Sequence, residues 1–71
     1  MNNILRLALL EMRQYDIMTS INWGEETSEL TNEFLENESK IGQLKKEFIN
    51  IDSLELKQLK ENALSTFYKE L

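Results

Sequence analysis

The sequence predicts an all-α protein in which three helices pack together, the longest of them central. Proline is absent and glycine occurs only at positions 24 and 42, so little in the chain interrupts a helix. From Trp23 to Ile51, apolar residues recur at alternating steps of four and three, as in a helix that buries a narrow stripe. Residues typical of helix caps precede each predicted helix. A chain of 71 residues is long enough for a single domain with a small core.

The first helix is expected over residues 3–18, with Asn2 or Asn3 as its N-terminal cap. Its apolar residues surround the helix axis, and Arg6 is the only charged residue in the first two turns. A helix that is apolar on every side is buried on more than one side. Because one short chain can hardly cover it, we expect a second copy or a different protein to do so. The predicted apolar partner-binding residues are Leu5, Leu9, Leu10 and Met12.

The central helix is expected over residues 23–49, because Asn22 and Glu25 have the spacing of a capping box. Thr27 and Asn37 interrupt its apolar stripe, and Gly42 marks either a close helix crossing or a break. The third helix is expected over residues 53–71, since Asp52 and Glu55 repeat the capping-box spacing. The stripe consists of Trp23, Leu30, Phe34, Ile41, Leu44, Phe48 and Ile51.

The stripe could pair with a second copy in a coiled coil or pack within the chain. Parallel pairing would bring Glu33 against Glu38 of the other copy, which is unfavourable, whereas antiparallel pairing brings Glu33 near Lys40. Phe34 and Phe48 in the stripe suit an irregular core made with the other helices. We therefore expect a helical hairpin with the third helix laid across it, and dimerisation through the first helix.

The residue types present exclude most catalytic chemistry. Histidine and cysteine are both absent, which removes the common general base, the thiol nucleophile and the imidazole or thiolate metal ligands. No base is placed to activate a serine or threonine, so we interpret these residues as caps and solvent-facing side chains. We expect no enzymatic activity, no cofactor, no bound metal and no small-molecule substrate.

Six glutamates and no basic residue lie between positions 23 and 39, and the chain carries a net charge of −5. Such a block repels phosphate backbones, so we expect no direct binding of nucleic acid. The block either serves only to keep the protein soluble or engages a basic groove on a target protein. The predicted acidic partner-binding residues are Glu25, Glu26, Glu29, Glu33 and Glu36.

Part of this block, Glu25-Glu26-Thr27-Ser28-Glu29-Leu30, has the form E-E-x-x-E-L. It resembles the first metal-binding element of the all-α nucleoside triphosphate pyrophosphatases. The resemblance implies Glu25, Glu26 and Glu29 as magnesium ligands. It covers six residues, and the E-x-x-D element that the family carries on its next helix is not found in this chain. We therefore do not expect the family's activity here.

No stretch approaches the roughly 20 apolar residues that cross a bilayer, and no signal peptide pattern is present, so we expect a cytoplasmic protein without membrane contact. The small size and the composition rich in Asn, Lys, Ile and Glu resemble small accessory proteins of phages and mobile elements. We expect a regulator or inhibitor that binds a partner protein stoichiometrically. The alternatives are a structural homo-oligomer, such as a scaffolding factor, and an acidic mimic that blocks a nucleic-acid-binding groove.

Overall fold

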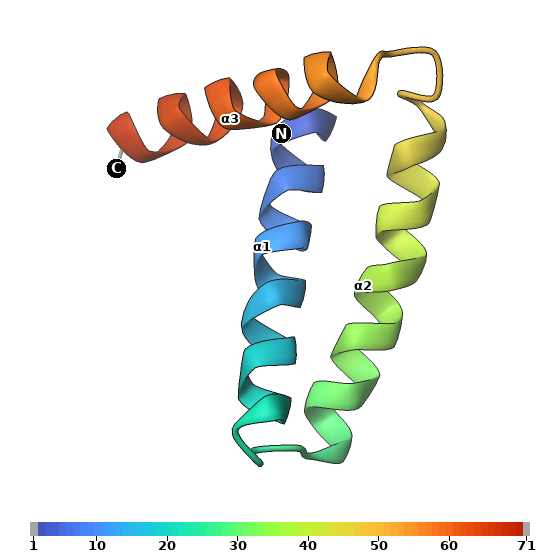
Figure 1. Cartoon of the computed structure of the whole chain (residues 1–71), viewed down its shortest axis with the longest axis vertical. Helices are drawn as coiled ribbons and strands as arrows, with labels where there is room; N and C mark the ends of the chain where they lie inside the picture. The colour runs from blue at the N-terminus through green and yellow to red at the C-terminus, as the bar shows by residue number, and fades with distance from the viewer. Residues whose placement is uncertain (1, 71) are drawn as a thin grey trace.

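The computed structural model describes residues 2–70, and within them the chain is all-α, as predicted. The helices are α1 (Asn3–Asn22), α2 (Ser28–Lys46) and α3 (Ser53–Lys69). Helices α1 and α2 lie side by side as an antiparallel hairpin, and α3 is laid across the N-terminal end of α1 (Figure 1). Helix α3 packs on α1 alone and makes no packing contact with α2. None of these helices is both long and apolar enough to cross a membrane.

Helix α1 begins and ends at recognisable caps. The Asn2 side chain accepts a hydrogen bond of 2.8 Å from the backbone N–H of Ile4, which selects Asn2 from the two predicted caps. The helix ends in a Schellman motif, in which Gly24 donates to the Ile21 carbonyl and Glu25 donates to the Ser20 carbonyl, both at 2.9 Å. Gly24 has a φ of 83°, which glycine adopts without steric cost. The helix therefore runs to Asn22, four residues past the predicted end at 18.

The predicted start of the second helix at residue 23 is wrong. Trp23 is instead the C-terminal cap of α1 and is 81% exposed, so it takes no part in an apolar stripe. Helix α2 begins at Ser28, because the Thr27 hydroxyl caps it by accepting from the Leu30 N–H at 3.1 Å. Thr27, which interrupts the predicted apolar stripe, is thus the N-terminal cap of α2. The capping box expected between Asn22 and Glu25 does not form, since both lie outside α2.

The C-terminal half of α2 is continuous through Gly42, so this glycine marks no break. A side chain at Gly42 would meet nothing within 4 Å, so it marks no close helix crossing either. The helix ends at Lys46, three residues before the predicted end at 49, and turns occupy residues 47–50. Helix α3 begins at Ser53 as its capping sequence predicted, with Asp52 accepting from the Leu54 N–H at 3.2 Å. Its last predicted residue, Leu71, lies outside the described residues.

The core is small and lies between α1 and α2. Leu7, Ile41 and Leu44 form its buried cluster, and Leu10 and Phe48 pack against it while remaining partly exposed. Ile17 extends the buried side of α1 towards the end of the hairpin. Helix α3 contributes no fully buried residue. The chain therefore encloses few apolar side chains, and most of the apolar surface of α3 is only half-covered.

The all-round apolarity of α1 is explained largely within the chain, because α2 and α3 occupy different sides of it. Leu7 and Leu10 face the hairpin core with α2. On the other side, an ion pair of 2.7 Å between Glu11 and Lys60 ties α1 to α3. Because α3 crosses only the first half of α1, this second side is covered near the N-terminus and open farther along the helix (Figure 1).

Candidate protein-binding surface

The four predicted apolar partner-binding residues are spread over different surroundings. Leu10 packs against the core beside α2, and Leu5 lies beside Ala63 and Phe67 of α3. Leu9 is half-buried, and Met12 is 41% exposed. Leu5 and Leu10 are therefore partly buried by contacts within the chain. Of the four residues, Met12 has the most accessible side chain.

A different set of residues forms the exposed apolar surface of this side of the molecule. Met12, Tyr15 and Met18 follow one another at three-residue steps along α1, and their exposed fractions are 41%, 74% and 45%. Tyr68 of α3, 51% exposed, joins them, because its hydroxyl lies 3.9 Å from the Met12 sulfur. We call this set the corner face: it lies where α3 crosses α1, and consists of Met12, Tyr15, Met18 and Tyr68.

Two contacts lie next to the corner face. The Tyr68 ring packs edge-on against the Phe67 ring, with 5.5 Å between their centroids, and Phe67 is half-buried against α1. The Glu11–Lys60 ion pair lies close to the same crossing and is partly shielded from solvent. Of these two contacts, the ion pair joins α3 to α1. The exposed rings and thioethers are thus presented on two helices in a defined arrangement.

Sequence analysis missed three of these four residues. The three-residue spacing of Met12, Tyr15 and Met18 places them on one side of the helix. What the pattern could not supply is the place where α3 crosses, which covers the start of this side and leaves its end exposed. Tyr68 is far from Met12 in the sequence, and only the crossing of the two helices brings them together.

The acidic block is divided by the structure into bound and free carboxylates. Glu33 accepts two hydrogen bonds from the Arg13 guanidinium, at 2.6 and 2.9 Å. These bonds lower the pKa of Glu33 and raise the pKa of Arg13. Glu38 accepts a bond of 2.8 Å from the Gln14 amide. Both residues therefore help to join α1 to α2.

The remaining carboxylates of the block are exposed, and within residues 2–70 none of them forms an ion pair with α1. Glu25 and Glu26 belong to the connection before α2, Glu29 to its first turn and Glu36 to its exposed side. The E-E-x-x-E-L segment thus does not lie on one helix face. Within residues 2–70, no three acidic side chains stand close enough together to share a metal ion.

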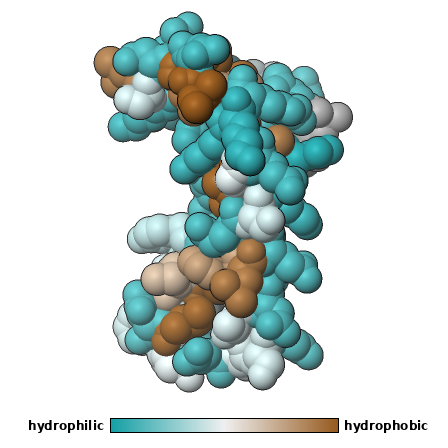
Figure 2. All heavy atoms as spheres, turned by 90° about the vertical axis from the view of Figure 1, so that its right-hand side faces the viewer, coloured by the Kyte–Doolittle hydropathy of each residue, from teal (hydrophilic) through white to brown (hydrophobic). Residues whose placement is uncertain are grey.

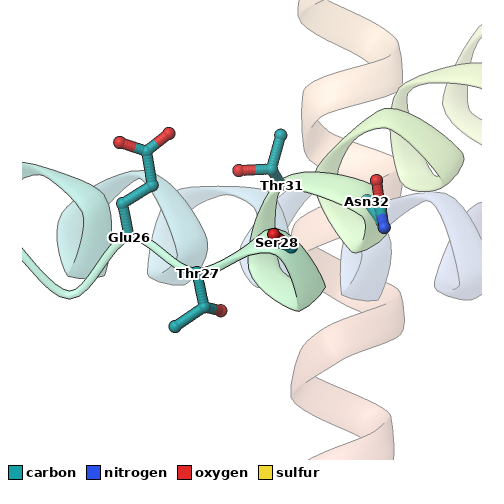
Figure 3. A pocket seen from close by; sticks show the side chains of 5 residues that line it. All are labelled: Glu26, Thr27, Ser28, Thr31 and Asn32. Carbon is teal, nitrogen blue, oxygen red and sulfur yellow. The ribbon is translucent and has the colours of Figure 1, made fainter.

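A shallow hollow at the start of α2 is lined by Glu26, Thr27, Ser28, Thr31 and Asn32. Figure 3 shows that these side chains do not converge, since Thr27 points away from Glu26 and Thr31. Thr27 is occupied as the helix cap. The hollow therefore has the character of an ordinary solvated first turn.

The outer side of α2 is mainly polar, with hydrophobic residues gathered near its lower end and at the top (Figure 2). The large apolar residues exposed outside the corner face are spread over the C-terminal cap of α1, α2, the turn after it and the start of α3; they are Trp23, Leu35, Ile49 and Leu54. Single exposed apolar residues are common on protein surfaces and need no partner to explain them. The corner face differs because its residues come from two helices and include a direct contact between them.

Two polar residues lie in the α1–α2 interface. Gln14 and Asn37 are both buried, with 7% and 6% of their surface exposed. The Gln14 amide nitrogen donates to the Phe34 carbonyl and to Glu38, whereas its carbonyl oxygen is buried without a hydrogen-bond partner. Asn37, predicted as an interruption of the apolar stripe, is thus a buried polar position of the hairpin.

Comparison with known proteins yields no match to this chain among protein-family models, curated proteins or solved structures.

Proposed function

We propose that this protein is a small regulator or inhibitor that acts by stoichiometric binding to another protein chain, and not by catalysis. The corner face carries the proposal. Met12, Tyr15, Met18 and Tyr68 are large side chains that remain exposed on neighbouring parts of two helices, with a direct contact between Met12 and Tyr68. Burying them against a partner would recover hydrophobic free energy that the isolated chain leaves unused.

The residue types of the corner face suit a binding surface. Tyrosine and methionine are enriched at the centres of protein–protein interfaces. Tyrosine buries a large apolar ring and keeps a polar hydroxyl for hydrogen bonds. Methionine is flexible and polarizable, so it adapts to an irregular partner surface. Spaced at three-residue steps on α1 beside α3, these residues offer the anchors of a helical docking surface.

Two alternatives use other features of the chain. A structural homo-oligomer is favoured by the same exposed corner face, if the partner is an identical chain. A mimic that occupies a nucleic-acid-binding groove would rely on the acidic block. Arg13 binds Glu33 and Gln14 binds Glu38. Fewer carboxylates are therefore free to contact a basic groove than the sequence suggested. We therefore place the binding surface on the corner face.

A test uses Tyr15→Asp, which puts a charge at the most exposed position of the corner face. The matched control is Leu35→Asp, which puts the same charge on an exposed apolar residue of α2. Tagged chains are isolated from the cells that make them, and native mass spectrometry identifies chains bound at fixed stoichiometry. We expect a complex that survives high salt, is lost in Tyr15→Asp and persists in Leu35→Asp.

Binding through the acidic block would give a different pattern. Its complex would weaken steeply with salt and disappear in Glu29→Lys combined with Glu36→Lys, while Tyr15→Asp would leave it intact. That result, or a complex unaffected by either set of changes, would refute the corner face as the binding surface.

A further inference from the structure

We infer that the corner face is occupied by a second copy of this chain, in an antiparallel pair in which α3 of each copy covers the open half of α1 of the other. This inference rests on the proposed function in taking the corner face as the binding surface, and it adopts the identical chain, given above as an alternative, as the partner. Three observations support it: the surplus of accessible surface, the place where α3 projects, and the distribution of charge.

The accessible surface is larger than a compact chain of this mass requires. The structure exposes 5448 Å², whereas a folded monomer of 8.4 kDa exposes about 4,600 Å². The radius of gyration of 13.4 Å likewise exceeds the roughly 11 Å of a compact domain of this length. The surplus of about 800 Å² equals the area that one partner contributes to a standard protein–protein interface. One additional subunit would bury an area of this size.

Helix α3 projects beyond α1 (Figure 1). Helix α3 has 17 residues, which makes it about 25 Å long, yet it crosses α1 and continues beyond it (Figure 1). None of its residues is buried, and Leu64 beside Ala8 and Tyr68 beside Met12 lie at the crossing with α1. Below that crossing, Tyr15 and Met18 of α1 keep 74% and 45% of their surface exposed.

Antiparallel pairing places each projection on the other copy's open surface. When one copy is turned end over end, its α3 lies at the level of the other copy's Tyr15 and Met18. The twofold axis makes the two contacts identical, so the pair is closed and needs no third copy. Each α1 would then be covered along both halves, by its own α3 and by that of its partner.

The charge distribution opposes the parallel alternative. Residues 13–36 contain one basic residue and six acidic ones, and so carry the whole net charge of −5. These residues form the end of the hairpin away from α3 (Figure 1). Parallel copies would place two such ends together, whereas antiparallel copies place each beside the neutral end that carries α3. The acidic residues are Asp16, Glu25, Glu26, Glu29, Glu33 and Glu36.

The first experiment measures the mass of the purified chain by sedimentation equilibrium across a wide range of concentration. We expect a reversible rise to twice 8.4 kDa. Tyr15→Asp and Tyr68→Asp each weaken the dimer about thirtyfold or more, as loss of a central interface residue does. Leu35→Asp leaves the dimerisation constant unchanged. Circular dichroism checks that all variants stay helical, which the exposure of the three substituted side chains favours.

The second experiment tests the orientation. The chain contains no cysteine, so introduced thiols are the only sites for a short bismaleimide cross-linker. Met18→Cys chains mixed with Tyr68→Cys chains should cross-link to each other rapidly. Glu26→Cys chains should not cross-link to one another, because antiparallel copies hold these ends a helix length apart. Fast cross-linking between Glu26→Cys chains would overturn the antiparallel arrangement.

The two proposals fail in different ways. A chain that stays monomeric at every concentration, yet binds a different protein and loses it in Tyr15→Asp, overturns the second copy and keeps the binding function. A chain that stays monomeric and forms no complex that Tyr15→Asp disrupts overturns both proposals. A dimer that Leu35→Asp disrupts and Tyr15→Asp does not would place self-association on another surface and overturn the inference.

Discussion

At the residue scale, the most specific contact between α1 and α2 is the pair of Arg13 and Glu33. Two hydrogen bonds join the guanidinium to the carboxylate in a fork, which fixes the relative position of the two helices more closely than a single bond would. Gln14, the next residue, bridges the same helices through Phe34 and Glu38. Buried polar groups of this kind favour one register between helices over others. The hairpin register is therefore set by polar contacts as well as by its small core.

Glu33 should make the stability of the fold depend on pH. Arg13 lowers the pKa of the Glu33 carboxyl in the folded chain, so the unfolded chain binds a proton more readily. The resulting stability is present above the unfolded-state pKa of about 4.3 and is lost as the pH falls through the lower folded-state pKa. We predict that Glu33→Gln lowers the melting temperature at neutral pH and that its difference from the wild type shrinks on acidification.

Thermal unfolding followed by circular dichroism over a pH series measures this difference. Glu36→Gln is the matched control, because Glu36 is an exposed glutamate of the same helix with no ion pair among residues 2–70. It should leave the melting temperature nearly unchanged at neutral pH. A Glu33→Gln deficit that stays constant down to strongly acidic pH would contradict the assignment of the effect to ionised Glu33.

At the element scale, the boundaries of the helices depend on a few local residues. Asn2, Thr27 and Asp52 each accept a hydrogen bond from a backbone N–H in the first turn of their helix. Gly24 ends α1 because it adopts the left-handed conformation that closes the Schellman motif. The second glycine, Gly42, sits inside α2 with open space around it. The two glycines thus have opposite roles.

Substituting alanine at the two glycines should have opposite effects. Gly24→Ala forces a side chain into a positive φ and should lower the free energy of unfolding by about 1 kcal/mol. Gly42→Ala replaces a poor helix former with the best one and should raise it by about 1 kcal/mol. Urea unfolding of both variants measures the two values. If both substitutions changed the free energy of unfolding in the same direction, these assignments would be contradicted.

At the scale of the whole molecule, α1 is the helix that contacts both others among residues 2–70. Helix α3 packs on one side of it and contributes no buried residue, so its attachment rests on half-buried side chains and the Glu11–Lys60 pair. An open arrangement of this kind concentrates stability in the hairpin. It also leaves the corner face exposed on the side of α1 that α3 only partly covers.

This arrangement predicts uneven protection of backbone amides. In dilute protein, amides in the middle of α3 should exchange with solvent faster than those in the middle of α1, because α3 can detach without opening the hairpin core. Residue-resolved hydrogen exchange by NMR measures both sets. Equal protection in α1 and α3 would show that the three helices unfold as one unit.

Much of the fold follows from local sequence signals. The absence of proline, the helical spacing of apolar residues and the cap at Asp52 were enough to predict an all-α chain and the start of α3. The start of α2 was mispredicted, since two capping sequences compete within six residues. Asn22 and Glu25 match the capping-box pattern, but Gly24 closes α1 with a Schellman motif and leaves Thr27 to cap α2.

The sequence by itself determined the all-α fold class, the distribution of charge along the chain and the surplus of apolar residues on the first helix. These properties depend on residue type and on neighbours within a few positions, so they can be read from the chain. Only the tertiary structure decided which apolar residues stay exposed. Where α3 crosses α1 depends on packing between residues far apart in sequence, such as Met12 with Tyr68 and Glu11 with Lys60. That crossing covers part of Leu5, exposes Tyr15 and Met18, and so places the candidate binding surface.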